Sequence, residues 1–318
     1  MRNMLRGSIY FLILLVLQVV LPMDDIFRVL GVKDIKSALL INHIVSFFIP
    51  AIIYIVITKQ STKKVLKLNK LYLKDIVLVI ILAIVCQPVM TFFSLVSQLF
   101  YTNDVGAMIT SIVDSSYIIL LLLIAVMPAI TEEITIRGII LSDYEELNTY
   151  VACILTGILF GMMHLNPQQF LYTAILGGIL ALVVKLTNSI FASMIIHFIV
   201  NGTSITLAKI MSNTTTQEMM AEAEEVSLMA MSLEEKVVVI GVYFVLALAF
   251  GVVGYFVLKA LAKSNIKRGT ISEDTIAFIR KKKQYRCNSG DIKFYKIANT
   301  LLGVLIVVVY IFIMNGIM

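Results

Sequence analysis

Five residues with acid–base chemistry lie inside strongly apolar stretches of this 318-residue chain. Glu132, Glu133 and Arg137 fall within the sequence MPAITEEITIRGIIL. His164 falls within ILFGMMHL, and His197 falls within FASMIIHFIVNG. An ionisable side chain in hydrocarbon is costly unless it is paired or wetted, so such residues usually face a bundle interior and carry function. Carboxylates and imidazoles at such a place are suited to moving protons to and from a bound water or substrate.

The helical spacing of Glu132, Glu133 and Arg137 predicts different surroundings for the two glutamates. Glu133 and Arg137 are four residues apart, so they share one helix face and are expected to form an ion pair. Glu132 is rotated from Glu133 by about 100° and points elsewhere. Pro128, one turn earlier, is expected to kink the helix and to free backbone groups there. We therefore predict one carboxylate that is held by arginine and a second that stays free for chemistry.

Two further pairs with the same spacing accompany the histidines. Asn201 lies one turn after His197, so both side chains can aim at one point. Phe160 lies one turn before His164. Counted at 1.5 Å per residue from the expected cytoplasmic helix ends, Glu132 and the two histidines lie about 12–21 Å deep. A single buried site built from three helices is therefore geometrically possible.

Each of these features also has a purely structural explanation. A lone histidine in a membrane helix is often only a hydrogen-bonding residue, and a Glu–Arg pair could simply hold two helices together. Two glutamates, two histidines, an arginine and an asparagine at matching depth on three helices fit a functional site better.

The composition places these residues in a membrane protein. Of all residues 59% are hydrophobic and 14% are charged, and the mean hydropathy is +0.96, whereas a soluble domain has about 25% charged residues. The apolar residues fall in blocks of membrane-spanning length, so we expect an all-α, polytopic membrane helix bundle of about eight or nine transmembrane helices. The first, fifth and sixth of nine blocks are short, and are expected to be tilted or incomplete. The blocks lie at roughly 8–22, 39–57, 76–100, 117–141, 150–165, 169–184, 189–210, 237–258 and 297–317.

The distribution of cations indicates an orientation. Lysines fill the connection after the second block, and Lys and Arg residues are dense again between Lys259 and Lys296. With the N-terminus in the cytoplasm, both connections fall on the cytoplasmic side, as the positive-inside rule requires. We therefore predict a multi-pass protein of the cell membrane with a cytoplasmic N-terminus. This distribution argues against a nucleic-acid partner despite the net charge of +6, and membrane lipids are the expected partners.

At these residues the sequence resembles the CPBP family, the CAAX-protease and bacteriocin-processing intramembrane peptidases that are also called the Abi family. The family pattern is EExxxR, then FxxxH, then HxxxN. Here it reads Glu132 to Arg137, Phe160 to His164, and His197 to Asn201, in order on separate apolar blocks. No motif position departs from the pattern.

The resemblance implies a glutamate-type intramembrane endopeptidase that acts on membrane-associated or lipidated peptides or proteins. Its implied settings are peptide maturation and bacteriocin self-immunity. In such enzymes the residues matching Glu132 and His164 activate a water, and those matching His197 and Asn201 stabilise the oxyanion. Three further motif residues are implied to support the site: Glu133, Arg137 and Phe160.

The resemblance also divides the chain into three parts of one membrane domain. We expect N-terminal transmembrane helices at 1–115 and the catalytic core at 116–211. The part 212–318 is expected to hold an outer acidic loop, a transmembrane helix, a basic cytoplasmic loop and a C-terminal transmembrane helix. Segment 212–236 is either an amphipathic surface helix or a solvated connector. The first helix is expected to be retained, because residues 21–24 (LPMD) lack the small residues of a signal-peptide cleavage site.

Three alternatives stay open. Two histidines and a glutamate could hold zinc with one open position, although the HExxH motif is absent and we prefer a mechanism without metal or cofactor. The chain could be a catalytically idle membrane scaffold or binding protein, because family resemblance does not prove turnover. A transporter or proton relay also uses intramembrane Glu and His residues, but no internal repeat supports it.

Overall fold

The computed structural model describes residues 2–21, 23–214, 228, 230–279 and 292–317, and the regular structure within them is helical, without strands. Eight helical segments of this described part are long and apolar enough to cross a membrane. The predicted all-α, polytopic membrane bundle is therefore confirmed.

The N-terminal part contains α1 (Arg2–Val20), α2 (Met23–Val29), α3 (Ile35–His43), η1 (Ile44–Phe48), α4 (Ile49–Thr58), α5 (Thr62–Val65), α6 (Leu73–Gln98) and α7 (Asp104–Ile112). The central part contains α8 (Tyr117–Leu121), η2 (Leu122–Val126), α9 (Met127–Glu133), η3 (Ile134–Ile140), α10 (Leu141–Asp143), α11 (Thr149–Met163), α12 (Pro167–Thr187) and α13 (Ile190–Thr214). The C-terminal part contains α15 (Leu233–Arg268), α16 (Glu273–Ile279) and α17 (Ile292–Ile317). The η segments are π-helical and continue the α-helices on either side of them.

Two of the blocks predicted to be short are longer in the structure. α1 has 19 residues and α12 has 21, because both helices continue through flanking polar residues. Only α11, with 15 residues, stays below the length that crosses a membrane without tilt or thinning. The predicted surface helix within 212–236 falls largely outside the described residues.

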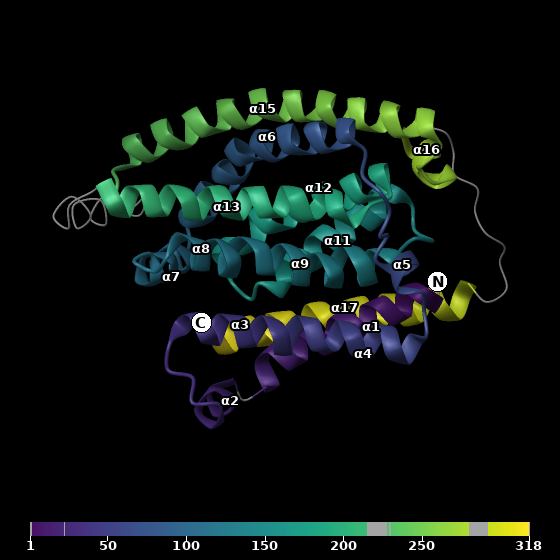
Figure 1. The fold of residues 1–318 in the computed structure, drawn as a ribbon, viewed down its shortest axis with the longest axis horizontal. Coiled ribbons are helices and arrows are strands. Elements are labelled where there is room, and N and C mark those ends of the chain that lie inside the picture. Colours follow the sequence, from purple (N-terminus) through teal and green to yellow (C-terminus); the bar gives the residue numbers. More distant parts are fainter. Residues whose placement is uncertain (1, 22, 215–227, 229, 280–291, 318) are drawn as a thin grey trace.

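The helices are arranged in layers (Figure 1). α15 and α6 pair along one side, α12 and α13 lie next to them, α9 and α11 follow, and α1, α3, α4 and α17 form the opposite side. α11 packs along α12, and α13 contacts both α6 and α9. Elements from three neighbouring layers therefore meet around α9.

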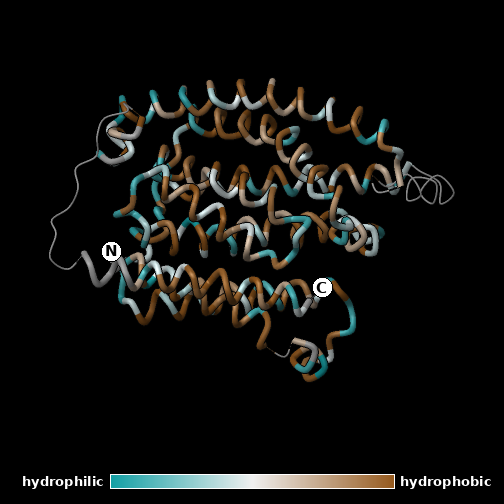
Figure 2. The backbone as a smooth tube through the Cα atoms, turned by 180° about the vertical axis from the view of Figure 1, so that it is seen from behind, coloured by the Kyte–Doolittle hydropathy of each residue, from teal (hydrophilic) through white to brown (hydrophobic). Residues whose placement is uncertain are grey.

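Hydropathy follows this arrangement. Figure 2 shows hydrophobic residues along the lengths of the helices and hydrophilic residues concentrated toward the helix ends and connections. The two chain termini lie at opposite ends of the bundle, and α1 and α17 run side by side (Figure 1). This placement fits an odd number of crossings, as the nine predicted blocks require.

Polar contacts fix the helix ends on the side of the N-terminus. Arg6 on α1 donates from Nε to Asp143 Oδ2 on α10 at 3.0 Å. Lys67 Nζ, in the connection after α5, pairs at 2.9 Å with Glu145 Oε1, in the connection after α10. The segment from α9 to α10 is thus anchored at its end and buried along most of its length.

Candidate active site

The two glutamates lie where their span changes its hydrogen-bond pattern. α9 carries Glu132 and Glu133 at its C-terminal end, between the π-helical segments η2 and η3. Pro128 occupies the first turn of α9 and has no N–H to donate, which fits the change of pattern just before it. The disturbance predicted at Pro128 therefore takes the form of a π-helical segment, a feature that often occurs at functional sites.

Glu133 and Arg137 form the ion pair that their spacing predicts. Arg137 Nη1 donates to Glu133 Oε1 at 2.9 Å, and both side chains are 0% exposed. Arg137 Nη2 donates to the carbonyl oxygen of Gly177 on α12 at 3.2 Å. The guanidinium carbon lies 4.2 Å from the centroid of the Phe160 ring on α11. Because a buried charge is stable only when it is paired, this cluster holds Glu133 and fixes η3 against α11 and α12.

His197 on α13 lies between the two carboxylates. Its Nδ1 donates to Glu133 Oε1 at 2.9 Å, and its Nε2 is 3.9 Å from Glu132 Oε2. Glu132 is 8% exposed, and its Oε2 atom is buried without a hydrogen-bond partner among the described residues. Glu133 Oε2 is also buried without a partner in the described part of the chain. The difference is that Glu133 is tied through Oε1 to Arg137 and His197, whereas Glu132 is not held by either of these hydrogen bonds.

His164 ends α11 and is oriented by its own helix. Its Nδ1 lies 2.8 Å from the carbonyl oxygen of Phe160 and must carry the proton, because a carbonyl oxygen only accepts. In the neutral imidazole, Nε2 is then an acceptor. His164 is close enough to Glu132 and His197 to interact with both electrostatically. The following residue, Leu165, has a φ of 47°, a left-handed cap that lets the chain reverse directly after the histidine.

Asn201 lies one turn after His197, as predicted, but its amide contacts the backbone. Asn201 Nδ2 donates to the carbonyl oxygen of Ile124 in η2 at 3.0 Å. The π-helical segment thus fixes the orientation of this side chain. An amide nitrogen carries two protons, so one N–H remains for another acceptor.

The structure adds a residue that the sequence analysis missed. His43, the third histidine of the chain, ends α3, and its Nδ1 is 3.0 Å from Thr131 Oγ1 on α9. It is close enough to Glu132, His164 and His197 to interact with all three electrostatically. A signal was available, because His43 is an ionisable residue inside the second apolar block.

No three His, Cys, Asp or Glu side chains among the described residues converge closely enough to hold a metal ion. In each of the three histidines Nδ1 is hydrogen-bonded, to an oxygen of Glu133, Phe160 or Thr131, which leaves Nε2 as the nitrogen open to another ligand.

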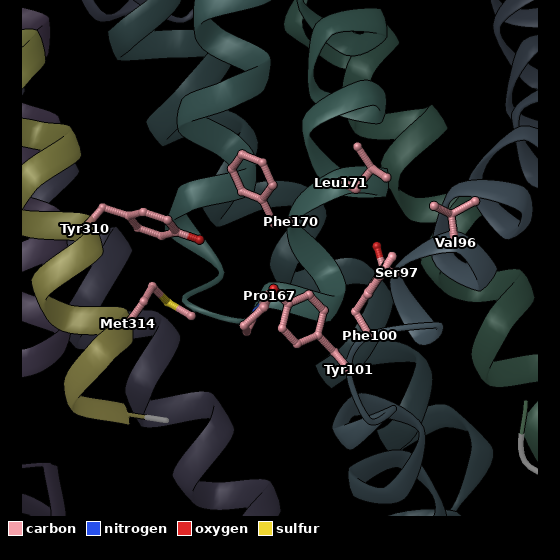
Figure 3. A pocket seen from close by; sticks show the side chains of 9 residues that line it. All are labelled: Val96, Ser97, Phe100, Tyr101, Pro167, Phe170, Leu171, Tyr310 and Met314. Atoms are coloured by element: carbon pink, nitrogen blue, oxygen red, sulfur yellow. The ribbon is translucent and has the colours of Figure 1, made fainter. Parts of the chain in front are cut away.

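An apolar pocket lies next to Pro167 at the start of α12 (Figure 3). It has a volume of about 350 Å³ and lies between the end of α6, the start of α12 and α17. Pro167 belongs to its wall and is three residues from His164. The lining residues are Val96, Ser97, Phe100, Tyr101, Pro167, Phe170, Leu171, Tyr310 and Met314.

Comparison with known proteins agrees with the motifs. A family model described as Type II CAAX prenyl endopeptidase Rce1-like matches residues 114–203. This segment contains all three motifs and runs from just before α8 into α13. No curated protein and no solved structure matches the chain. Residues 114–203, which bring Glu132, His164 and His197 together in a multi-pass membrane protein, are therefore similar to the Rce1-like type II CAAX prenyl endopeptidases.

Proposed function

We propose that this protein hydrolyses peptide bonds of membrane-borne or lipidated peptides with a water activated by Glu132 and His164. The observation that carries the proposal is the contrast between the two glutamates. Each glutamate has one buried oxygen without a hydrogen-bond partner among the described residues. Glu133 is held through Oε1 by both Arg137 and His197 and is fully buried, whereas Glu132 lies 3.9 Å from His197 Nε2 and keeps 8% exposure. A buried carboxylate that is not held in this way is suited to act as a general base.

Water attack needs one group to take a proton and another to orient the water. The water oxygen forms a bond to the peptide carbonyl carbon while its proton passes to Glu132. The Nε2 lone pair of His164 accepts the second O–H and fixes the direction of attack. When the C–N bond breaks, Glu132 returns the proton to the leaving amine.

The oxyanion that forms in this step needs donors that are already in place. His197 Nδ1–H is engaged with Glu133, so Nε2 can donate only when the ring is protonated. Glu132 is neutral at this stage because it carries the proton of the water, so protonated His197 and Arg137 balance the charges of Glu133 and the oxyanion. The second N–H of Asn201 supplies the other donor, and each donor contributes about 3–4 kcal/mol.

The proposed substrate has an apolar portion that enters the pocket next to Pro167, three residues after His164 in the chain. Its wall is made almost entirely of apolar and aromatic side chains, which fits a lipid chain or a hydrophobic segment of a membrane-borne peptide. The family name points to prenylated CAAX peptides as one such class. Peptide maturation or bacteriocin self-immunity is the biological setting that we propose.

Mass spectrometry of cleavage products from a peptide library tests this function. Purified wild-type protein should cleave a subset of peptides, with a preference for the prenylated members over matched unlipidated ones. Glu132→Gln should lower kcat/KM by about 10²–10⁴-fold, the contribution expected of a general base. The exposed control Glu234→Gln should keep wild-type activity.

Three results of this experiment would contradict the proposal. Equal cleavage by wild type and Glu132→Gln would remove Glu132 from the chemistry. Loss of activity on chelation with recovery on added zinc would favour a metal enzyme. A biological effect that survives both Glu132→Gln and His164→Ala would favour an idle scaffold.

A further inference from the structure

His43 reaches the site from outside the segment that matches the family. It ends α3, at 35–43, whereas the matched segment begins at residue 114. α3 and η1 both pack against α9, the element that carries Glu132. The ring of His43 also contacts Phe47, with centroids 5.4 Å apart, so its position is fixed within its own span.

The hydrogen bond between His43 and Thr131 defines the protonation of the ring. Thr131 Oγ1 donates its single proton to the carbonyl oxygen of Met127 at 3.0 Å. It can therefore only accept from His43, so Nδ1 of His43 carries a proton. In the neutral ring Nε2 is an acceptor, and on protonation it becomes a donor with a full positive charge.

Both acidic and basic side chains surround His43. Glu132 on α9 attracts a positive charge on the ring, whereas His164 at the end of α11 and His197 on α13 repel it when they are protonated. Glu133 and Arg137 lie in the same cluster and neutralise one another. Glu132 is therefore the carboxylate whose charge His43 can sense and influence.

We propose that His43 is a positioning residue for Glu132: it holds the turn that precedes Glu132 through Thr131, and it brings a titratable ring into electrostatic reach of that carboxylate. This inference rests on the proposed function for its effect on turnover. It also predicts an electrostatic coupling between His43 and Glu132 that exists whether or not a substrate is cleaved.

Kinetics of His43→Asn and His43→Leu separate the two parts of this role. An asparagine amide nitrogen can occupy the place of Nδ1 and keep the hydrogen bond to Thr131, but it cannot titrate. We expect His43→Asn to keep KM within about twofold and to lower kcat about 10-fold, and His43→Leu to lower kcat about 100-fold, a loss typical of a misplaced catalytic group. The pH dependence of kcat/KM should change in both variants, because a titratable ring near Glu132 is removed.

The neighbouring variant Asn42→Ala is the matched control for these measurements. Asn42 lies on the same helix and accepts a hydrogen bond from Ser46 at 2.9 Å. It should show wild-type kcat and the wild-type pH profile. If His43→Asn also shows both, His43 is only a structural residue and the proposal is wrong.

Histidine-selective NMR tests the coupling without activity. The chain has three histidines, so a labelled sample in micelles gives few signals, and His43→Asn identifies the one from His43. Glu132→Gln should change the pH dependence of the His43 signal, since the carboxylate within electrostatic reach of the ring is gone. An unchanged His43 titration would overturn the proposal. Absence of cleavage by wild type together with an intact coupling would count against the proposed function alone.

Discussion

Arg137 is a buried cation that needs several partners to compensate its charge. Its side chain is 0% exposed and has three partners: the Glu133 carboxylate, the Gly177 carbonyl oxygen and the Phe160 ring. A planar guanidinium satisfies all three at once, which a lysine ammonium cannot do. The pair thus keeps Glu133 charged and oriented toward His197.

We predict that Arg137→Met destabilises the protein by about 3–5 kcal/mol, the cost of leaving a buried charge without its partner. The double variant Glu133→Gln/Arg137→Met should recover part of this loss, because the glutamine carries no charge and still accepts from His197. Thermal unfolding in detergent, followed by circular dichroism, measures both. Equal stability of the single and double variants would show that the unpaired charge is not the cause.

At the scale of elements, the site depends on the close approach of α11 and α12. A Cβ built on Gly157 would lie 2.5 Å from the Ala174 carbonyl oxygen and 2.8 Å from the Gly178 nitrogen. Both neighbours are backbone atoms of α12 and cannot move aside independently. The small residue therefore lets α12 present the Gly177 carbonyl to Arg137 while α11 presents Phe160 and His164.

We predict that Gly157→Ala forces the two helices apart and lowers both stability and turnover. Overpacking of this kind costs about 1–3 kcal/mol. Gly178→Ala is the matched control, since its Cβ would meet only the Cys153 carbonyl oxygen at an ordinary 3.5 Å. Unfolding temperature and kcat/KM should fall for Gly157→Ala and stay near wild type for Gly178→Ala. Equal behaviour of the two variants would remove the helix contact as the cause.

At the scale of the whole molecule, the positions of the lysines can be compared with the two ends of the helix bundle. α5, α16 and the N-terminus lie at one end, and the C-terminus lies at the other (Figure 1). The lysines near α5 belong to the end that the positive-inside rule assigns to the cytoplasm. In the orientation that we propose, the segment matching the family model has Asp143 at its cytoplasmic end, and the pocket near Tyr101 lies toward the outer side.

We predict that Lys70 faces the cytoplasm and Asn213 faces the outside. Both side chains are exposed, so a cysteine at either position can be labelled. In a background with Cys86, Cys153 and Cys287 replaced by alanine, a membrane-impermeant maleimide should label Asn213→Cys in intact cells. It should label Lys70→Cys only after permeabilisation, and the reverse pattern would invert the proposed orientation.

The sequence by itself determined the features that depend on neighbours along the chain. Apolar blocks define helices because their length matches the bilayer, and the Glu133–Arg137 pair follows from one helical turn. The three motifs also lie in the matched family segment, so the region of the site could be predicted.

The tertiary structure decided the contacts between helices. Local spacing does not encode that His197 lies between two carboxylates, that Asn201 donates to Ile124, or that His43 joins from α3. These contacts depend on how helix axes pack and on the π-helical segments that change the direction of side chains. Whether a buried histidine belongs to the site therefore depends on how several helices pack around α9, and it cannot be deduced from one helix alone.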